Sequence, residues 1–441
     1  MMKFFNLILL CLNCTTAFSQ ALSCDDLFKY ALENSPTIKS NQLDVLLADQ
    51  QIKQALTAGY PKINGTLSFQ NFIDIPTTVV PAAAFDPTAP ADQLIGLQFG
   101  TDFNANYNLQ LDQLIFSFTY IYGVRTAKSY KELAQLIKNK SFEDLFLDIK
   151  LSVGNYIFLN KNIALVEKNK KEIESLIAKT NALIKEGFLE KNSINELEFL
   201  QLEMLSLLND FKNKSKATTL NIKNKIGYPM DSTISITSDF SSTLSSFIDF
   251  KTDQNNTSEV KIVSQNLKLD ELQLKITKSE GLPVVSGYFS HQQMAMRNSF
   301  NFFDTQKDWF PATLWGINVN IPIFNSGEGK AKTTQKEIAI LKTTHQLENI
   351  SREIATLLQM LKDDYQTSID RYEIYAKKLQ VADNIYHDEL KKYELGTSQL
   401  MNLSEKKMQV IKAEQELLEK ELEIYKIKAQ LEKYTNSVKY D

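Results

Sequence analysis

Two long segments with almost no helix breakers constrain this chain more than any other feature of its sequence. They are 124–226 and 330–438, and neither contains a proline. Their only glycines are Gly154, Gly187 and Gly396. Because proline and glycine disfavour helix interiors, both segments predict long helices. We expect each to be interrupted well past its middle, at Gly187 and Gly396.

These predicted helices are too long for a compact globular domain. A continuous helix over 123–186 extends roughly 95 Å, and one over 325–395 a little over 100 Å, at about 1.5 Å per residue. Near the end of the chain apolar residues repeat with helical spacing, with one polar member: Met408, Ile411, Gln415, Leu418, Leu422, Tyr425 and Ala429. We therefore expect two antiparallel coiled-coil hairpins, 123–226 and 325–438, with tips near 187 and 396, that stack into a tube.

Four other stretches alternate apolar and polar residues with a period of two. They are 62–72, 102–116, 284–294 and 312–324. This period predicts β-strands with one apolar and one polar face. The fold class is therefore mainly α with β.

The chain also repeats itself. Each half runs helix, strand, loop, strand, long helix, glycine, shorter helix, over 20–226 and again over 258–441. The sequence GYPKINGTLSF in the first half corresponds to GLPVVSGYFS in the second. A stretch rich in Ser, Thr, Asp and Asn, 227–257, joins the halves and is expected to be a linker or a small docking segment. We predict a two-fold internal structural repeat.

The N-terminal segment 1–19 has the pattern of a secretory signal. One lysine precedes an apolar run from Phe4 to Leu12, and Ala17 and Ser19 supply small residues before a cleavage site. The run is too short to span a bilayer as a helix, and no other stretch reaches the roughly 20 apolar residues required. We expect an exported protein without a transmembrane helix.

Cys24 would be the only cysteine left after cleavage, because Cys11 and Cys14 lie in the signal. No internal disulfide is then possible. The sequence before Cys24 has a weak likeness to a bacterial lipid-attachment site. A free thiol near the start of the first helix is the alternative that we favour.

Charge and motifs argue against several functional classes. The formal net charge is −4, which gives no basic surface for nucleic acid. His387-Asp388-Glu389 offers one imidazole, whereas zinc sites need three or four converging ligands. No glycine-rich phosphate loop and no recognisable nucleophile elbow is present. We expect no enzyme, no metal and no cofactor.

Strands of about 9–11 alternating residues are the unit of a transmembrane β-barrel. The alternative is an antiparallel sheet on a soluble core. An aromatic cluster after the second strand, Phe116, Phe118, Tyr120 and Tyr122, lies where a membrane-interface girdle is expected. Four strands cannot close a barrel, and an open edge in lipid leaves backbone groups unpaired. A trimer would supply twelve strands and an open passage, although geometry alone also allows a tetramer.

The order of these elements resembles the TolC-type outer-membrane efflux proteins. The likeness covers essentially the whole chain after the signal, and the segments Ile226-Gly227-Tyr228-Pro229 and Pro322-Ile323-Phe324-Asn325-Ser326-Gly327 contribute to it. The resemblance implies a homotrimer in the outer membrane of a Gram-negative bacterium, with a 12-stranded β-barrel continuous with a periplasmic α-barrel. It also implies two partners, an inner-membrane pump and a periplasmic adaptor (membrane fusion) protein. The chain would be the exit duct of a tripartite efflux or type I secretion system.

The resemblance also implies where an adaptor would dock. In this family, glycine turns at the helix tips are gripped by adaptors. The matching turns here are Glu186-Gly187-Phe188 and Leu395-Gly396-Thr397. A glycine supplies a turn with positive φ and lets a partner backbone approach closely. The plainer interpretation is that Gly187 and Gly396 are only helix C-caps.

A gate is the second site that the resemblance implies. Family members close the tunnel with acidic rings, and the matching positions are Asn402 and Glu405, with Ser193 and Glu196 in the first hairpin. Asn402 departs from the acidic pattern. A tyrosine matching Tyr393 helps to hold the tip shut in relatives by bonding an aspartate at position 193, which is serine here, so this latch is weakened. The glutamates are otherwise ordinary solvated charges of a coiled coil.

Two other functional classes remain at this stage. A periplasmic coiled-coil adaptor or scaffold without a barrel would be soluble, but an adaptor normally shows one helical hairpin between β-domains. An exported enzyme has no motif to support it. The sequence does not identify the cargo, which in ducts of this type includes drugs, metals, siderophores and proteins.

Overall fold

A computed structural model gives the structure of residues 22–90, 92–187, 189–237, 240 and 254–434, without the side chains of Asn192 and Ser193. The predicted signal, 1–19, and most of the second half of the predicted linker lie outside the described residues. The chain forms two compact units, and each takes segments from both halves of the sequence. One consists of 1–46, 133–264 and 345–441, and the other of 47–132 and 265–344.

The helices are long, as the lack of helix breakers predicts. Along the chain they are α1 (Cys24–Asn34), α2 (Pro36–Thr57), α3 (Phe118–Lys185), α4 (Asn195–Ile226), α6 (Ser258–Ser279), α7 (Glu328–Glu394) and α8 (Leu400–Tyr434). The longest, α3 and α7, have 68 and 67 residues. Within the described residues, no helix is both long and apolar enough to cross a membrane.

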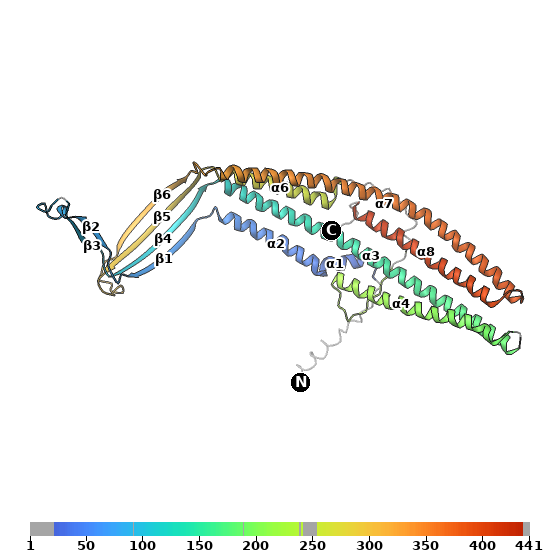
Figure 1. Cartoon of the computed structure of the whole chain (residues 1–441). Helices are drawn as coiled ribbons and strands as arrows, with labels where there is room; N and C mark the ends of the chain where they lie inside the picture. The colour runs from blue at the N-terminus through green and yellow to red at the C-terminus, as the bar shows by residue number, and fades with distance from the viewer. Residues whose placement is uncertain (1–21, 91, 188, 238–239, 241–253, 435–441) are drawn as a thin grey trace, which may run out of the picture. The chain divides into compact units, whose positions relative to one another are not determined.

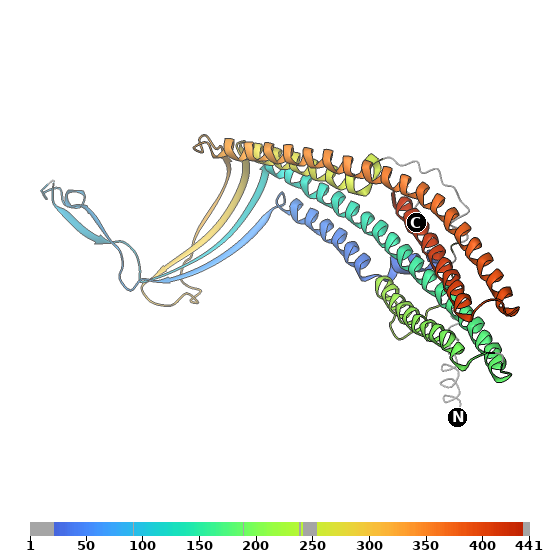
Figure 2. The ribbon, with the colours of Figure 1, turned by 45° about the vertical axis from the view of Figure 1, so that its right-hand side comes forward.

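The described part of the chain contains six strands, which form two separate sheets. They are β1 (Lys62–Asn71), β2 (Thr77–Pro81), β3 (Leu94–Gln98), β4 (Phe103–Phe116), β5 (Val284–Arg297) and β6 (Phe310–Asn320). The larger sheet has the order β1-β4-β5-β6, and every neighbouring pair is antiparallel. Figure 1 shows these four strands side by side, and the turned view in Figure 2 shows that they bend together. Strands from the two halves of the sequence thus meet where β4 pairs with β5.

The structure corrects three details of the strand prediction. Strand β6 ends at Asn320, because Pro322 has no N–H with which to continue the ladder. Helix α3 already begins at Phe118, so Phe118, Tyr120 and Tyr122 are helical and only Phe116 of the predicted girdle lies in a strand. The loop after β1 contains a second hairpin, β2–β3, which its proline and alanine content did not predict.

The core of the first unit is an apolar cluster shared by α1, α3, α4 and α8. Its fully enclosed members include Leu27 of α1, Val153 of α3 and Ile226 of α4. Tyr425 of α8 closes the cluster, with its ring 5.4 Å from that of Phe240. The four helices are therefore held together by ordinary burial of apolar side chains.

Helix α8 buries two stripes of residues, one more than the sequence predicted. The predicted stripe includes Ile411 and Leu422, which pack in clusters with α3 and α4. A second stripe, with Ile424 and Leu431, packs on Leu361 and Tyr365 of α7. Helix α8 therefore contacts both α3 and α7. The internal repeat remains a prediction.

Ion pairs join α3 to α8 at regular intervals. Lys150 pairs with Glu432, Lys161 with Glu421 at 3.1 Å, and Lys168 with Glu414 at 3.5 Å. Each step of 11 or 7 residues along α3 is matched by an equal step back along α8. This pattern fixes one antiparallel register between the two helices. We call these three pairs the α3–α8 ladder.

Candidate functional site

The turn between α3 and α4 follows directly from Gly187. This glycine has φ 79° in the left-handed region, and its N–H donates to the carbonyl of Ile184 at 3.0 Å. Among the described residues, a Cβ placed here would have no atom within 4 Å, so this side of the turn faces open space. Phe188 lies outside the described residues. A 3₁₀ turn, Lys191–Ile194, leads into α4.

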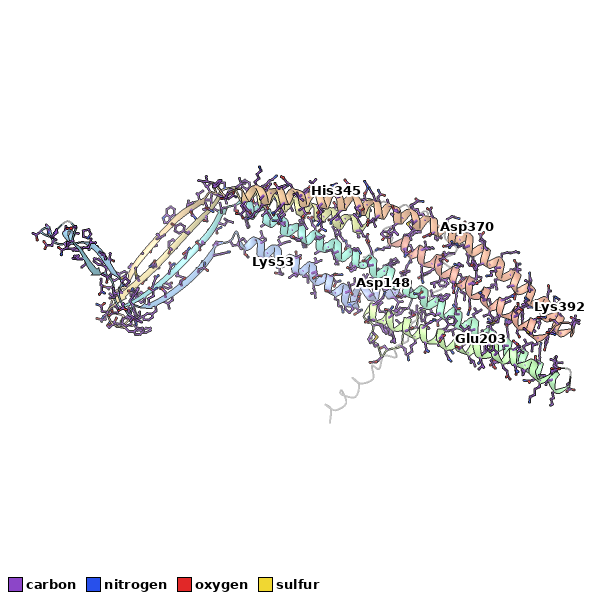
Figure 3. All side chains as sticks on the ribbon, viewed as in Figure 1. Lys53, Asp148, Glu203, His345, Asp370 and Lys392 are labelled. Carbon is purple, nitrogen blue, oxygen red and sulfur yellow. The ribbon has the colours of Figure 1, made fainter. Side chains whose placement is uncertain are left out.

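The turn between α7 and α8 has the same construction. Gly396 has φ 72° and is equally free of neighbours. The N–H and the hydroxyl of Thr397 both donate to the carbonyl of Lys392, at 2.9 and 3.0 Å. Figure 3 labels Lys392 at this turn. Both glycines are therefore C-cap residues, and both turns are exposed.

An apolar cluster packs the two turns together. It joins all four long helices and comprises Leu176, Leu197, Leu400 and Leu403, with Tyr386, Leu390 and Tyr393 at its edge. Leu197 and Leu403 have no exposed surface. The ends of the two hairpins therefore pack into one unit, which we call the tip.

Tyr393 contacts α3. Its hydroxyl lies 3.2 Å from the hydroxyl of Thr180, which is fully buried. Ser193 lies in the 3₁₀ turn, and its side chain is not described. Sequence reasoning missed Thr180, because it lies 213 residues from Tyr393 and its spacing within α3 gives no sign of the contact.

Three of the four predicted gate residues, Glu196, Asn402 and Glu405, have exposed side chains near the starts of α4 and α8. Asn402 is exposed next to the buried Leu403, and Glu196 is exposed in the first turn of α4. The Glu405 side chain is 61% exposed, and its Oε1 accepts from Lys406 Nζ at 3.2 Å and Gln409 Nε2 at 3.1 Å. Among the described residues, the Glu405 carboxylate therefore accepts hydrogen bonds from side chains of its own helix.

The carboxylate of Glu389 stabilises the α7–α8 turn. The Ser398 hydroxyl donates to Glu389, and Lys392 Nζ lies 3.4 Å from the same carboxylate. The hydrogen bond from Ser398, followed by the Lys392 charge, lowers the pKa of Glu389 below its usual value. The sequence signal was a serine just after the Gly396 turn.

Lys407 is the buried charge of the tip. It is 4% exposed, pairs with Glu172 of α3, and lies 5.0 Å from the ring centre of Tyr386. Burial raises the pKa of Tyr386. In the part of the chain that the structure describes, no cluster of His, Cys, Asp and Glu could hold a metal ion.

Comparison with known proteins links part of the chain to one family. Residues 254–437 match the family model for outer membrane efflux proteins. This segment is less than half of the chain. No curated protein sequence matches the chain significantly.

Solved structures share the fold of this chain over nearly its full length. CusC, studied for folding and transmembrane channel formation, has a TM-score of 0.77 at 11% identity, with 93% of this chain and 91% of that chain covered. The outer membrane protein VceC of Vibrio cholerae gives 0.71 at 13% identity, covering 93% and 95%. The MtrE outer membrane channel of Neisseria gonorrhoeae gives 0.71 at 12%, covering 93% and 88%.

The matched family model is that of outer membrane efflux proteins, and MtrE is an outer membrane channel. At these identities the likeness to solved structures establishes the fold alone. The function, partners and assembly of this chain therefore have to be argued from its own residues.

Proposed function

We propose that this chain is an outer-membrane channel-tunnel, the exit duct of a tripartite efflux or type I secretion system. It would form a homotrimer in the outer membrane of a Gram-negative bacterium. An inner-membrane pump and a periplasmic adaptor would deliver its cargo. The observation that carries the proposal is a four-stranded sheet with two open edges, combined with long helical hairpins and the family match.

The open edges give the physical reason for assembly. Strand β1 pairs only with β4, and β6 pairs only with β5, among the described residues. An unpaired strand edge in lipid costs several kcal/mol per backbone group. Pairing of β6 with β1 of the next chain removes both edges. Three chains would give twelve strands, which leaves room for a passage.

Exposed apolar residues of the sheet support membrane contact. On β1, Ile63 and Leu67 are 70% and 77% exposed. On β6, Trp315 and Ile317 are 76% and 62% exposed. All four lie on the same face in the strand register, and such a face is expected to meet lipid.

Membrane fractionation of the full protein tests the proposal. We expect it in the outer-membrane fraction, resistant to carbonate washing and soluble only in detergent. Chemical cross-linking in detergent should then give a trimer. A monomer that washes off as a soluble protein would overturn the proposal and restore the scaffold alternative.

We further propose a docking surface and a gate at the tip. Gly187 and Gly396, with Phe188 and Thr397, would meet the adaptor, and the open space at both glycines supports this. Three copies each of Asn402, Glu405, Ser193 and Glu196 would surround the narrowest point of the tunnel. Converging carboxylates would favour cations there.

A further inference from the structure

The strand register determines which residues share a face of the larger sheet. Residues paired across antiparallel strands project to the same side. Asn108 pairs with Thr66 of β1 and Gln292 of β5, and Gln110 pairs with Asn64 and Ser290. The alternating positions of all four strands can therefore be assigned to one of two faces. We call the face that contains Asn108 the amide face.

Amides and hydroxyls dominate the amide face. Its hydrogen-bonding residues are Asn64, Thr66, Ser68, Gln70, Asn104, Asn106, Asn108, Gln110, Ser286, Tyr288, Ser290, Gln292, Asn318 and Asn320. Uncharged apolar residues and a glycine complete it, and Met294, Met296 and Phe310 gather toward the β5–β6 turn. Lys62 and Asp112 are the only charged residues on this face of the four described strands.

The two charges oppose each other. Lys62 and Asp112 are direct partners in the β1–β4 register, so their charges cancel within one row. Neighbouring polar groups also bond one another. Gln110 Nε2 donates to Asp112 Oδ1 at 2.8 Å, and the Ser290 hydroxyl donates to Asn108 Oδ1 at 2.8 Å. The amide face is thus a hydrogen-bonding surface without net charge.

Channels select ions with rings of like charge in their walls. The amide face has no such ring, because its only carboxylate is opposed by an ammonium group in every chain. We propose that the barrel of this protein does not discriminate cargo by charge. It passes cations, anions and neutral polar molecules through hydrogen-bonding groups, and any charge selection is exerted by the helical part of the duct.

This inference rests on the proposed function, since it needs the amide face to line the lumen. It also narrows that function. The sheet and the helical tip have different roles, and charge on a cargo molecule matters only at the tip. The barrel contributes a water-filled exit of uniform polarity.

Reversal potentials in planar bilayers test the inference with the full protein. A KCl gradient is applied, and wild type is compared with Lys62→Gln, Asp112→Asn and the double variant. Each single variant leaves three unopposed charges, so we expect shifts of opposite sign, toward cations for Lys62→Gln and toward anions for Asp112→Asn. The double variant should match wild type. A changed potential in the double variant would overturn the inference.

Charge added after assembly avoids any effect on folding. Asn108→Cys is made in a Cys24→Ser background, and the conducting channel is treated with a sulfonate-bearing or a trimethylammonium-bearing methanethiosulfonate. We expect a shift toward cations with the first reagent and toward anions with the second. Leu109→Cys, on the opposite face, should not respond. Absence of any shift at Asn108 would place this face outside the ion path and overturn the inference.

Failure of the proposed function gives a different result from failure of the inference. If the chain forms no oligomer and no conducting channel, the duct itself is refuted. If channels conduct but the double variant alters ion selectivity, the duct stands and the charge-neutral barrel is refuted.

Discussion

Gly154 and Gly123 both lie inside α3, but their surroundings differ. A Cβ at Gly154 would lie 2.7 Å from Cδ1 and Cε1 of Tyr425 on α8. At Gly123 nothing lies within 4 Å. Tyr425 is itself 9% exposed and packs on Phe240, so it has little space to move. Gly154 is therefore required by packing, which the sequence alone did not reveal.

Alanine at these two positions should have opposite effects. Gly154→Ala forces Tyr425 out of place and should destabilise the protein by about 1–3 kcal/mol, the usual cost of overpacking. Gly123→Ala should stabilise it by up to about 1 kcal/mol through helix propensity. Thermal unfolding followed by circular dichroism measures both. Equal effects from the two substitutions would show that the Tyr425 contact is unimportant.

The glycine turns of the tip can be tested with a matched control. Gly187→Arg and Gly396→Arg should abolish export in cells while leaving the oligomer intact, because a long side chain blocks the approach of the adaptor backbone. Gly327→Arg is the control, since Gly327 has φ 82° and no neighbour within 4 Å, but precedes α7. It carries the same strain away from the tip. If all three variants lose export equally, the proposed docking role of Gly187 and Gly396 is wrong.

Glu405 is the residue on which the gate proposal depends. Glu405→Ala should weaken cation selectivity or change the conductance in planar bilayers, because three carboxylates disappear from the entrance. Asn402→Ala should alter conductance with less effect on selectivity, since an amide has no net charge. If ion selectivity and conductance are unchanged in both variants, these side chains do not line the constriction.

At the scale of elements, the α3–α8 ladder acts together with buried amides. Asn162 and Asn169 lie seven residues apart on α3 and have no exposed surface. Asn169 Nδ2 donates to Glu414 Oε2 at 3.0 Å. Buried polar groups at heptad positions specify register at a cost in stability. A shift of α8 by one turn would leave the Asn169 amide and the ladder unmatched.

A charge swap tests the ladder. Lys161→Glu places like charges opposite Glu421 and should destabilise the protein, and adding Glu421→Lys should recover most of the loss. We expect a coupling energy of about 1 kcal/mol for this partly buried pair. Lys212 and Glu167, 3.0 Å apart but both about half exposed, provide the comparison. Their coupling should be smaller, and equal couplings would contradict a special role for the ladder.

The elements also show what sequence reasoning can reach. The absence of helix breakers predicted α3 and α7, and the period-two alternation predicted β1, β4, β5 and β6. Both signals are local in the sequence. Strand order and register depend on contacts between distant segments, so the β4–β5 pairing was not predicted. The end of β6 was placed too late, because Pro322, Ile323 and Phe324 continue the apolar pattern without continuing the hydrogen bonds.

At the scale of the whole chain, one charge network joins three helices from both halves of the sequence. Lys433 of α8 is 8% exposed and lies 2.7 Å from Asp144 of α3 and 3.1 Å from Glu259 of α6. Lys140 lies 2.6 Å from Asp144. Burial acts to raise the pKa of Asp144, but hydrogen bonds from Lys140 and Lys433 outweigh it and lower that pKa.

This lowered pKa predicts a pH dependence of stability. The carboxylate of Asp144 stabilises the folded state above the unfolded pKa of about 3.9, and the stabilisation is lost as the pH falls through the lower folded value. Asp144→Asn should therefore be destabilising at pH 7, and the difference from wild type should shrink below about pH 4. Urea unfolding at a series of pH values measures it. A difference that is constant down to pH 2 would contradict the role of this ionisation.

The single in-chain partners of β1 and β6 also affect how the protein reaches its final state. Before the proposed trimer assembles, a single chain has one unpaired backbone edge on β1 and one on β6 within the described residues, and such edges recruit any other strand. Correct pairing between chains therefore competes with aggregation, and the yield of assembled protein depends on the concentration of chains. We expect a substitution that slows subunit pairing to appear in cells as insoluble aggregates, and not as a stable monomer. Because two strand edges are unpaired, the yield of assembled protein depends on the rate of subunit pairing relative to the rate of aggregation.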